Sequence, residues 1–375
     1  MDMNCRVHAV SAGRGGTAPF FCRGAFVAAS APVGSPDELE NLPPGSYTAG
    51  ATEFDKDSDG KLSVCFNSDD TNTAWELLKK YPDAELVLND YRGFHGRDLD
   101  ILRDHTGLRH LQIACGHIQK QGMTGLRALE SLTVNEWNRD VDLGAFPQLR
   151  TFRGDCPKRM PKRMDELRTL ALWGYSGSDL AALPEMPNLR SLQLTQCGIR
   201  SFSGCDRFPE LREIAVAHCR RLADAAELRK IRLQWFSIVS CAKLNALYEL
   251  LTAQTGLLGL ELEGGIVLPD LEFLAGMPHL GYLWLLVSDI ADGDLRRCRD
   301  IPIVNYRNRR HYRPSFDELP PLEPQFEPLC HSGTTLANLA ARLGITLDMD
   351  RRELAALSDR YFGRQNATLQ SRSTE

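Results

Sequence analysis

Three consecutive stretches of the chain, LRSLQLTQC at residues 189–197, LREIAVAHC at 211–219 and LQWFSIVSC at 233–241, repeat one pattern every 22 residues. A fourth stretch, LRTLALWGY at residues 167–175, keeps the same register. The shared template is L-x-x-L-x-L-x-x-C. Self-similarity at a fixed period of about twenty to fifty residues is typical of a solenoid, in which each repeat stacks on the next. The pattern therefore predicts a repeat protein before any local motif is considered.

The template has a simple physical logic. Residues at its first, fourth and sixth positions are apolar and point inward, while those between them alternate outward along a short strand. One repeat cannot bury its own leucines, so neighbours must stack, which pairs their strands into a parallel sheet on one face. The ninth position suits a small side chain beneath the bend of the chain. We therefore expect Cys197, Cys219 and Cys241 to be buried, unreactive thiols.

The same frame extends along the chain in both directions with looser spacing. Further strands are predicted at residues 83–91, 108–113, 129–134, 149–152, 167–172, 257–262, 280–285 and 301–306. Several of them follow an apolar residue and a proline, as Met186-Pro187 does before Leu189. Proline suits a strand entrance because no donor of the strand ladder is lost there. Residues 61–66, which alternate like a strand, and the helical residues 73–81 predict an atypical first repeat.

At these residues the chain resembles the leucine-rich repeat superfamily, and most of all the short bacterial class of internalin-like proteins, with cysteine at the usual asparagine position. The resemblance covers roughly residues 83–306. It implies an α/β fold, a leucine-rich-repeat solenoid with a curved parallel sheet on the concave face and irregular or short helical returns on the convex face. It also implies that the chain binds other proteins.

The segments outside the repeats have a different composition. Residues 334–343 and 351–361 show helical apolar spacing, which indicates a helical cap. The first of these also looks like the opening helix of a helix-turn-helix, but no recognition helix follows after a short turn. The predicted organisation is an irregular or disordered leader at 1–60, the solenoid at 61–306, a Pro-rich wrapping segment at 307–330, a C-terminal helical cap at 331–363 and a disordered tail at 364–375.

Composition excludes several classes of function. A formal net charge of −5 argues against a non-specific nucleic-acid binder, which needs a strongly basic face. No apolar run approaches the length that crosses a bilayer. The 11 cysteines are spread through the repeats instead of being clustered as in small disulfide-bonded domains. We therefore expect a protein of a reducing compartment, the cytoplasm, that binds neither nucleic acid nor membrane.

Local motifs give little support to an enzymatic function. The segment DKDSDG at residues 55–60 matches the first half of a calcium loop, but Phe66 stands where a bidentate glutamate is needed. His218 adjoins Cys219, yet neighbours on a strand face opposite ways, whereas a nucleophile needs its base within hydrogen-bond reach. We expect no catalytic residue, no metal and no cofactor.

The outward positions of the strands carry the most functional information. Three of the five tryptophans occupy them, and exposed aromatic side chains on a curved sheet are expected where a partner supplies the missing burial. The alternative is that the tryptophans pack on one another or under a folded-back terminal segment. The predicted partner-binding residues are Trp173, Gln193, Glu213, Trp235, Glu261, Glu263, Tyr282 and Trp284.

Together these features predict a monomeric, non-enzymatic scaffold that docks a protein partner on its concave face. Because aromatic residues lie beside glutamates, the partner is expected to present a basic and partly apolar patch. An immunity-type or regulatory binder would act in this way. The alternative is an effector or a ubiquitin-ligase-like adaptor whose repeats select substrates.

Overall fold

The leucine pattern of the repeats is the frame on which the chain folds. The computed structural model describes residues 31–32, 39, 42–56, 60–116, 123–134, 140–241, 244–315, 318–326 and 336–347. These residues divide into an N-terminal unit, which ends at Pro161, and a C-terminal unit, which begins at Lys162. Each unit is described by itself.

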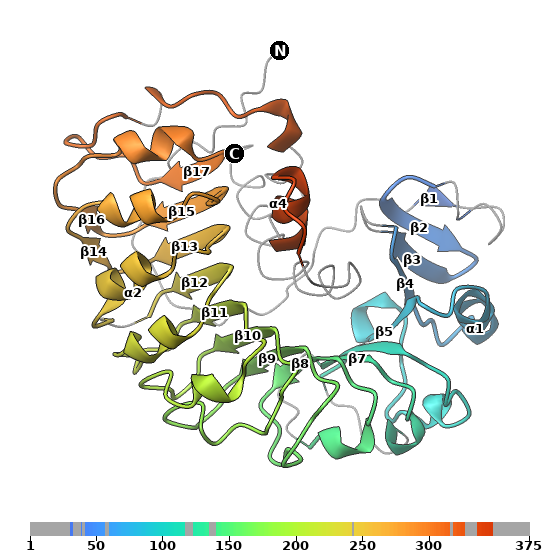
Figure 1. Cartoon of the computed structure of the whole chain (residues 1–375). Coiled ribbons are helices and arrows are strands. Elements are labelled where there is room, and N and C mark those ends of the chain that lie inside the picture. The colour runs from blue at the N-terminus through green and yellow to red at the C-terminus, as the bar shows by residue number, and fades with distance from the viewer. Residues whose placement is uncertain are drawn as a thin grey trace. The chain divides into compact units, whose positions relative to one another are not determined.

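The strands of the C-terminal unit are all parallel and follow one another in chain order (Figure 1). Leu192 pairs with Leu170 on one side and with Ile214 on the other, so the 22-residue register of the sequence is also the register of the sheet. The strands are β9 (Thr169–Trp173), β10 (Ser191–Thr195), β11 (Glu213–Ala217), β12 (Trp235–Val239), β13 (Gly259–Glu263), β15 (Tyr282–Leu286) and β17 (Ile303–Tyr306).

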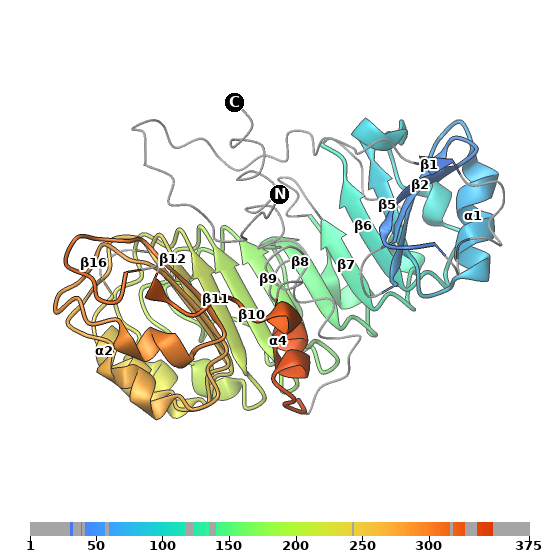
Figure 2. The same cartoon turned by 90° about the horizontal axis from the view of Figure 1, so that it is seen from above.

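Short helical segments return the chain from one strand to the next, on the side of the unit opposite the strands (Figure 2). They are η6 (Cys205–Arg207), η7 (Ala226–Lys230), α2 (Leu247–Ala253), η8 (Glu272–Gly276) and η9 (Arg296–Asp300). Two of the returns also pair as the short parallel strands β14 (Val267–Leu268) and β16 (Asp289–Ile290). The fold is a leucine-rich-repeat solenoid, and the predicted fold class is confirmed.

Stacked apolar side chains between the strands and the returns form the core of this unit. Leu170, Leu192, Ile214 and Phe236 occupy the fourth template position, and each is fully buried. Burial of one such side chain contributes roughly 1.5–3 kcal/mol. Because each repeat buries its neighbour's leucines, stability depends on an unbroken stack.

The eighth template position turns the chain at the end of each strand. Gln196, His218 and Ser240 adopt positive φ angles of 54°, 56° and 49° at this position. The left-handed conformation costs a residue other than glycine about 1–2 kcal/mol, but it directs the next residue back beneath the sheet. Cys197 and Cys219 are buried there as predicted, with the Cys197 backbone N–H donating to Cys219 Sγ at 3.2 Å.

The third thiol of this ladder departs slightly from expectation, because Cys241 is only half-buried. The hydrogen bond with the Cys197 thiol is the main cause that raises the pKa of Cys219, to about 12. A hydrogen bond with Cys219 raises the pKa of Cys241 in turn. These shifts favour the neutral thiol, which is the unreactive form.

The N-terminal unit continues the repeat pattern in looser form. Its parallel strands are β4 (Leu62–Cys65), β5 (Glu85–Asn89), β6 (His110–Ala114), β7 (Ser131–Val134) and β8 (Thr151–Asp155). The helix α1 (Thr71–Lys80) connects β4 with β5. The other connections contain η2 (Asp90–Arg92), η3 (Asp100–Leu102), η4 (Met123–Gly125) and η5 (Leu143–Ala145).

Part of the expected leader is an ordered hairpin. β2 (Gly45–Ala49) and β3 (Thr52–Lys56) pair antiparallel, β3 continues antiparallel onto β4, and β1 (Ala31–Pro32) pairs with β2. The ring of Tyr47 stacks on that of Phe54, while the Arg92 guanidinium binds the carboxylates of Glu53 and Asp55 at 2.7 Å each. Contacts with a residue some forty positions away order this hairpin, and local composition gives no sign of them.

The chain beyond β17 returns to the C-terminal unit. Tyr312 is buried, and its hydroxyl accepts a hydrogen bond from the Ile290 backbone at 2.9 Å. The segment η11 (Pro324–Phe326) and the helix α4 (Leu336–Arg342) follow. The second cap helix predicted at 351–361 lies outside the described residues. None of the described helices combines the length and apolar character needed to cross a membrane.

Candidate partner-binding face

The residues at the third, fifth and seventh template positions of β9–β17 form a surface that we call the strand face. Strand pairing arranges them in three rows across the sheet. All eight residues predicted to bind a partner lie on this face. Row one holds Glu213, Trp235 and Tyr282, row two holds Gln193, Glu261 and Trp284, and row three holds Trp173 and Glu263.

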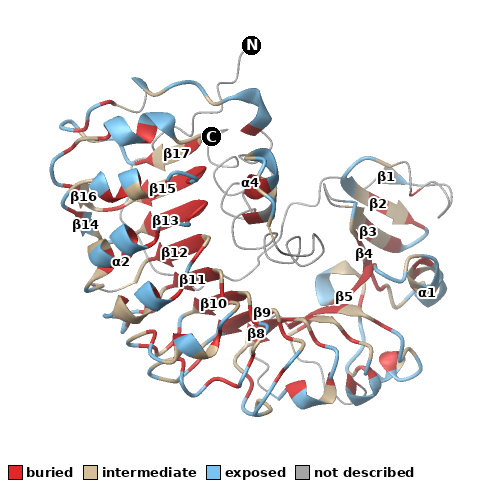
Figure 3. Cartoon of the chain, in the orientation of Figure 1, coloured by how far each residue is buried: buried red, intermediate tan, exposed pale blue. Residues whose placement is uncertain are grey.

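The part of the face on β9–β11, which we call the open half, carries the exposed tryptophan. The Trp173 residue is 39% exposed at the end of β9, as the sequence predicted for this position. Gln193 is half-buried on β10, and the small row-one residues Thr169 and Ser191 are buried. Figure 3 shows buried residues along these strands. The open half therefore presents one large aromatic ring above a floor of small side chains.

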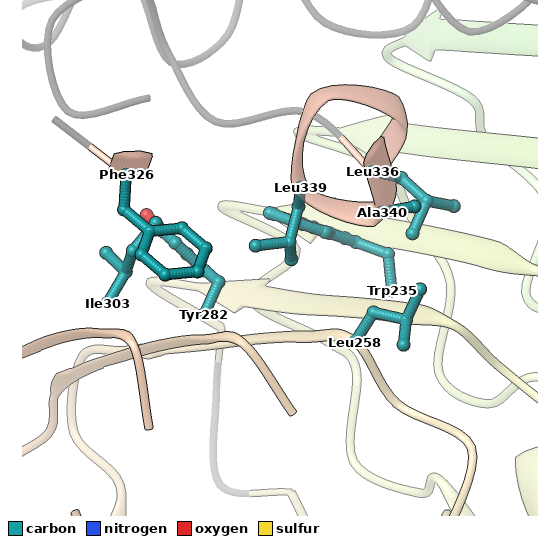
Figure 4. Packing of buried hydrophobic residues seen from close by; sticks show 8 residues of the cluster. All are labelled: Trp235, Leu258, Tyr282, Ile303, Phe326, Leu336, Leu339 and Ala340. Carbon is teal, nitrogen blue, oxygen red and sulfur yellow. The ribbon is translucent and has the colours of Figure 1, made fainter. Parts of the chain in front are cut away.

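The part of the face on β12–β17, which we call the covered half, differs from the prediction. Trp235 is only 1% exposed and Tyr282 only 6%, so the expectation that both would be exposed is wrong. The chain's own C-terminal segment packs on them (Figure 4). The cluster consists of Trp235, Leu258, Tyr282, Ile303, Phe326, Leu336, Leu339 and Ala340. The alternative of a folded-back terminal segment is the one that the structure shows.

Two glycines shape the covered half. A Cβ atom on Gly259 would lie 2.3 Å from Cε3 of Trp235, so the indole lies flat on bare backbone at this point. The Trp235 ring then stacks on Tyr282 with centroids 5.2 Å apart, and Tyr282 stacks on Trp284 at 6.2 Å. Near them, a Cβ on Gly281 would lie 2.6 Å from Cδ1 of Leu343, just beyond α4. Because neither glycine has a side chain, the Trp235 ring and the end of the C-terminal helix can approach the backbone closely.

The predicted acidic rim is also largely buried. Glu213 is 6% exposed and Glu261 only 1%, because neighbouring rows and strands close around them. Ser237 Oγ donates to Glu261 at 2.6 Å, but burial dominates and raises the pKa of Glu261 to about 8. Glu263 stays half-buried, and burial raises its pKa against the opposing charge of Arg307. Only Glu263 of the three remains available to a partner.

The helix on this face was predicted from the sequence, but its position was not. Leu336, Leu339, Ala340 and Leu343 have the spacing of one helix face. Gly281 leaves the second template position bare, where the other repeats of this unit carry larger residues. Apolar helix spacing together with a bare site on the sheet is the signal that could have placed it. Spacing within a helix alone does not identify the surface against which it packs.

The calcium-like segment at residues 55–60 is only partly described by the structure. Asp55 binds Arg92, while Asp57 and Asp59 of the calcium-like segment lie outside the described residues. Among the residues that the structure describes, no group of three or more His, Cys, Asp or Glu side chains is placed to hold a metal ion.

Comparison with protein-family models and with curated protein sequences found no match. Among solved structures, the chain is similar to an internalin, InlF, of Listeria monocytogenes, with a TM-score of 0.38 and 15% identity over 61% of this chain and 68% of that one. It is similar to the functional domain of InlJ from the same organism, described as including a cysteine ladder, with a TM-score of 0.34 and 15% identity over 60% and 49% of the two chains. A third similarity is to the Toll–Spätzle complex of Drosophila, with a TM-score of 0.33 and 12% identity over 68% and 49%.

The chain spans about half the length of the InlJ and Toll chains that it matches. At these levels of similarity, no activity or partner is transferred to this chain. The leucine-rich-repeat fold is established by its own repeats and strand register.

Proposed function

We propose that this chain is a non-enzymatic protein-binding scaffold that docks its partner on the open half of the strand face. The observation that carries the proposal is Trp173, 39% exposed on a face where the other predicted aromatic residues are largely buried. Exposed tryptophans surrounded by small residues are typical anchors of protein interfaces. Glu263 lies in the same row as Trp173 but on β13, in the covered half. A partner whose contact extends along this row would meet its carboxylate, which supports a partner with a basic and partly apolar patch.

The thiols support a reducing compartment, and we propose the cytoplasm. None of the eight cysteines of the described chain forms a disulfide, and six of them are buried. Buried thiols at repeat positions serve packing and need no oxidation to hold the fold.

The proposal is tested by affinity capture with the wild-type chain, with Trp173→Ala and with Tyr91→Ala. Tyr91 is a matched control because it is an 86% exposed aromatic residue of the N-terminal unit and lies off the strand face of β9–β17. We expect one stoichiometric partner, held equally by wild type and Tyr91→Ala. By calorimetry, Trp173→Ala should lose about 2 kcal/mol of binding free energy, roughly thirtyfold in affinity. Equal affinity for all three proteins would place the interface elsewhere.

A further inference from the structure

The covered half of the strand face has the construction of a helix-binding site. Its floor is the stacked series Trp235, Tyr282 and Trp284, and Gly281 leaves a bare place in which Leu339 and Leu343 lie. The side chain of Leu339 is fully buried although its helix belongs to a segment outside the repeats. A platform of this kind accepts the apolar face of an amphipathic helix, with anchors at positions i, i+3, i+4 and i+7.

The helix α4 shows what such an occupant looks like. Leu336, Leu339, Ala340 and Leu343 are its anchors, and Gly344 ends it with a φ of +68°. The Ile345 N–H donates to the Ala340 carbonyl and the Gly344 N–H to the Ala341 carbonyl, which is the glycine-terminated motif that closes many helices. An isolated helix this short is unstable in water, so the platform stabilises its helical form.

The contact between α4 and the platform is apolar and leaves one polar group of the platform unused. The cluster that joins them consists of hydrocarbon and aromatic side chains. Within the described part of the chain, no group accepts a hydrogen bond from the buried Trp284 Nε1. A different helix with the same apolar spacing and an acceptor opposite this indole would fit the platform better than α4 does.

We propose that the covered half is a receptor for an amphipathic helix of a partner protein, and that α4 occupies it in cis until such a helix displaces it. The partner helix carries leucine-like residues at i, i+3 and i+7, a small residue at i+4 and a hydrogen-bond acceptor toward Trp284. The covered and open halves belong to one continuous set of paired strands, so a partner docked at Trp173 lies on the same sheet. The proposal does not depend on Trp173 being an anchor, because its test uses a helix of known sequence.

The first experiment uses the full chain with Leu339→Asp and Leu343→Asp, which place charges in the apolar contact and unseat α4. The probe is a fluorescein-labelled peptide of residues 334–347, and binding is followed by anisotropy. We expect the peptide to bind the unseated protein at least tenfold more tightly than wild type, in which α4 competes. The same peptide with Leu339→Asp should not bind. Failure of the unmodified peptide to bind a folded, unseated protein overturns the proposal.

Two matched substitutions locate the binding site in the unseated protein. Gly281→Phe fills the place of Leu343, which packs against Gly281, and should weaken peptide binding at least tenfold. Trp173→Ala lies on the open half and should change binding less than twofold, which separates this proposal from the function proposed above. An effect of Trp173→Ala as large as that of Gly281→Phe contradicts a separate helix site.

The second experiment needs no variant. In wild type, amide hydrogen exchange of residues 336–343 should be at least a hundredfold faster than that of β12 and β13, because a displaceable helix opens without the strands. Equal protection of α4 and of the two strands would make α4 a fixed part of the fold and overturn the proposal. The proposal is also overturned if the protein with Leu339→Asp and Leu343→Asp does not fold. Light scattering measures the oligomeric state as a final check. A dimer that exchanges α4 between its two copies would mean that a second copy of this chain, and not a partner protein, supplies the helix.

Discussion

The open and covered halves of the strand face share one template but differ in what lies on them. Trp173 on β9 and Trp235 on β12 both occupy outward positions of their repeats. Trp173 is nevertheless 39% exposed, whereas Trp235 is only 1% exposed. Gly259 and Gly281 contribute to this difference, because their missing side chains leave room for the Trp235 indole and for the leucines of the C-terminal segment. A residue's position on a repeat therefore determines which way it points, whereas its exposure depends on what the rest of the chain brings to that face.

The largest expected effect tests the register that both halves share. Replacing Leu192 by Asp places an unpaired charge in the fully buried stack and should cost about 5 kcal/mol or more of unfolding free energy. The neighbouring Gln193→Asp is the control, because Gln193 is half-buried on the strand face. Urea unfolding of the two variants checks this, and a Leu192→Asp protein as stable as Gln193→Asp would contradict the assigned register.

The next effect separates the two halves directly. Trp235→Ala should lower the free energy of unfolding by about 4 kcal/mol, because it removes a buried ring from the contact with Tyr282 and α4. Trp173→Ala should change stability by less than about 0.5 kcal/mol, since its ring is exposed. Thermal and urea unfolding measure both. Similar losses in the two variants would mean that the distinction between the halves is wrong.

A smaller effect depends on pH and reports burial in the covered half. The pKa of Glu261 is raised from 4.5 to about 8 by burial, so the folded state holds a proton that the unfolded state has lost. Its contribution to stability is complete below pH 4.5 and is lost as the pH rises toward 8. Glu261→Gln should remove this dependence and be the more stable protein at pH 9. Parallel pH profiles of stability for the two proteins would show that Glu261 is hydrated.

The smallest expected effect concerns the thiols that follow β10, β11 and β12. Cys197 and Cys219 are buried and should label with a thiol reagent only after denaturant is added. Cys241 is half-buried and should label first in native buffer, although its hydrogen bond to Cys219 keeps it slow. Peptide mapping by mass spectrometry gives the order. Faster labelling of Cys219 than of Cys241 would contradict the placement of the ninth template position.

Much of the fold could be predicted because it is periodic. The leucine at the fourth position pairs with its equivalent 22 residues away, so Leu192, Ile214 and Phe236 could be aligned from the sequence alone. The hairpin at β2 and β3 could not be, since Arg92 orders it through contacts distant in the sequence. All eight candidate residues reached the predicted face. The burial of Trp235 depends on a helix about a hundred residues along the chain, and no strand pattern contains that information.

The short tether of α4 has a consequence for selectivity. Phe326 and Leu336 both pack on the covered half, and only ten positions separate them in the sequence. A segment held so close to its site acts at an effective concentration of about the millimolar range. A free helix present at about a micromolar concentration must therefore bind roughly a thousandfold more tightly than α4 does on its own in order to replace it. The tether thus sets a minimum affinity for a competing helix. The many weakly amphipathic helices of a cell fall below it, and only a closely matched helix replaces α4.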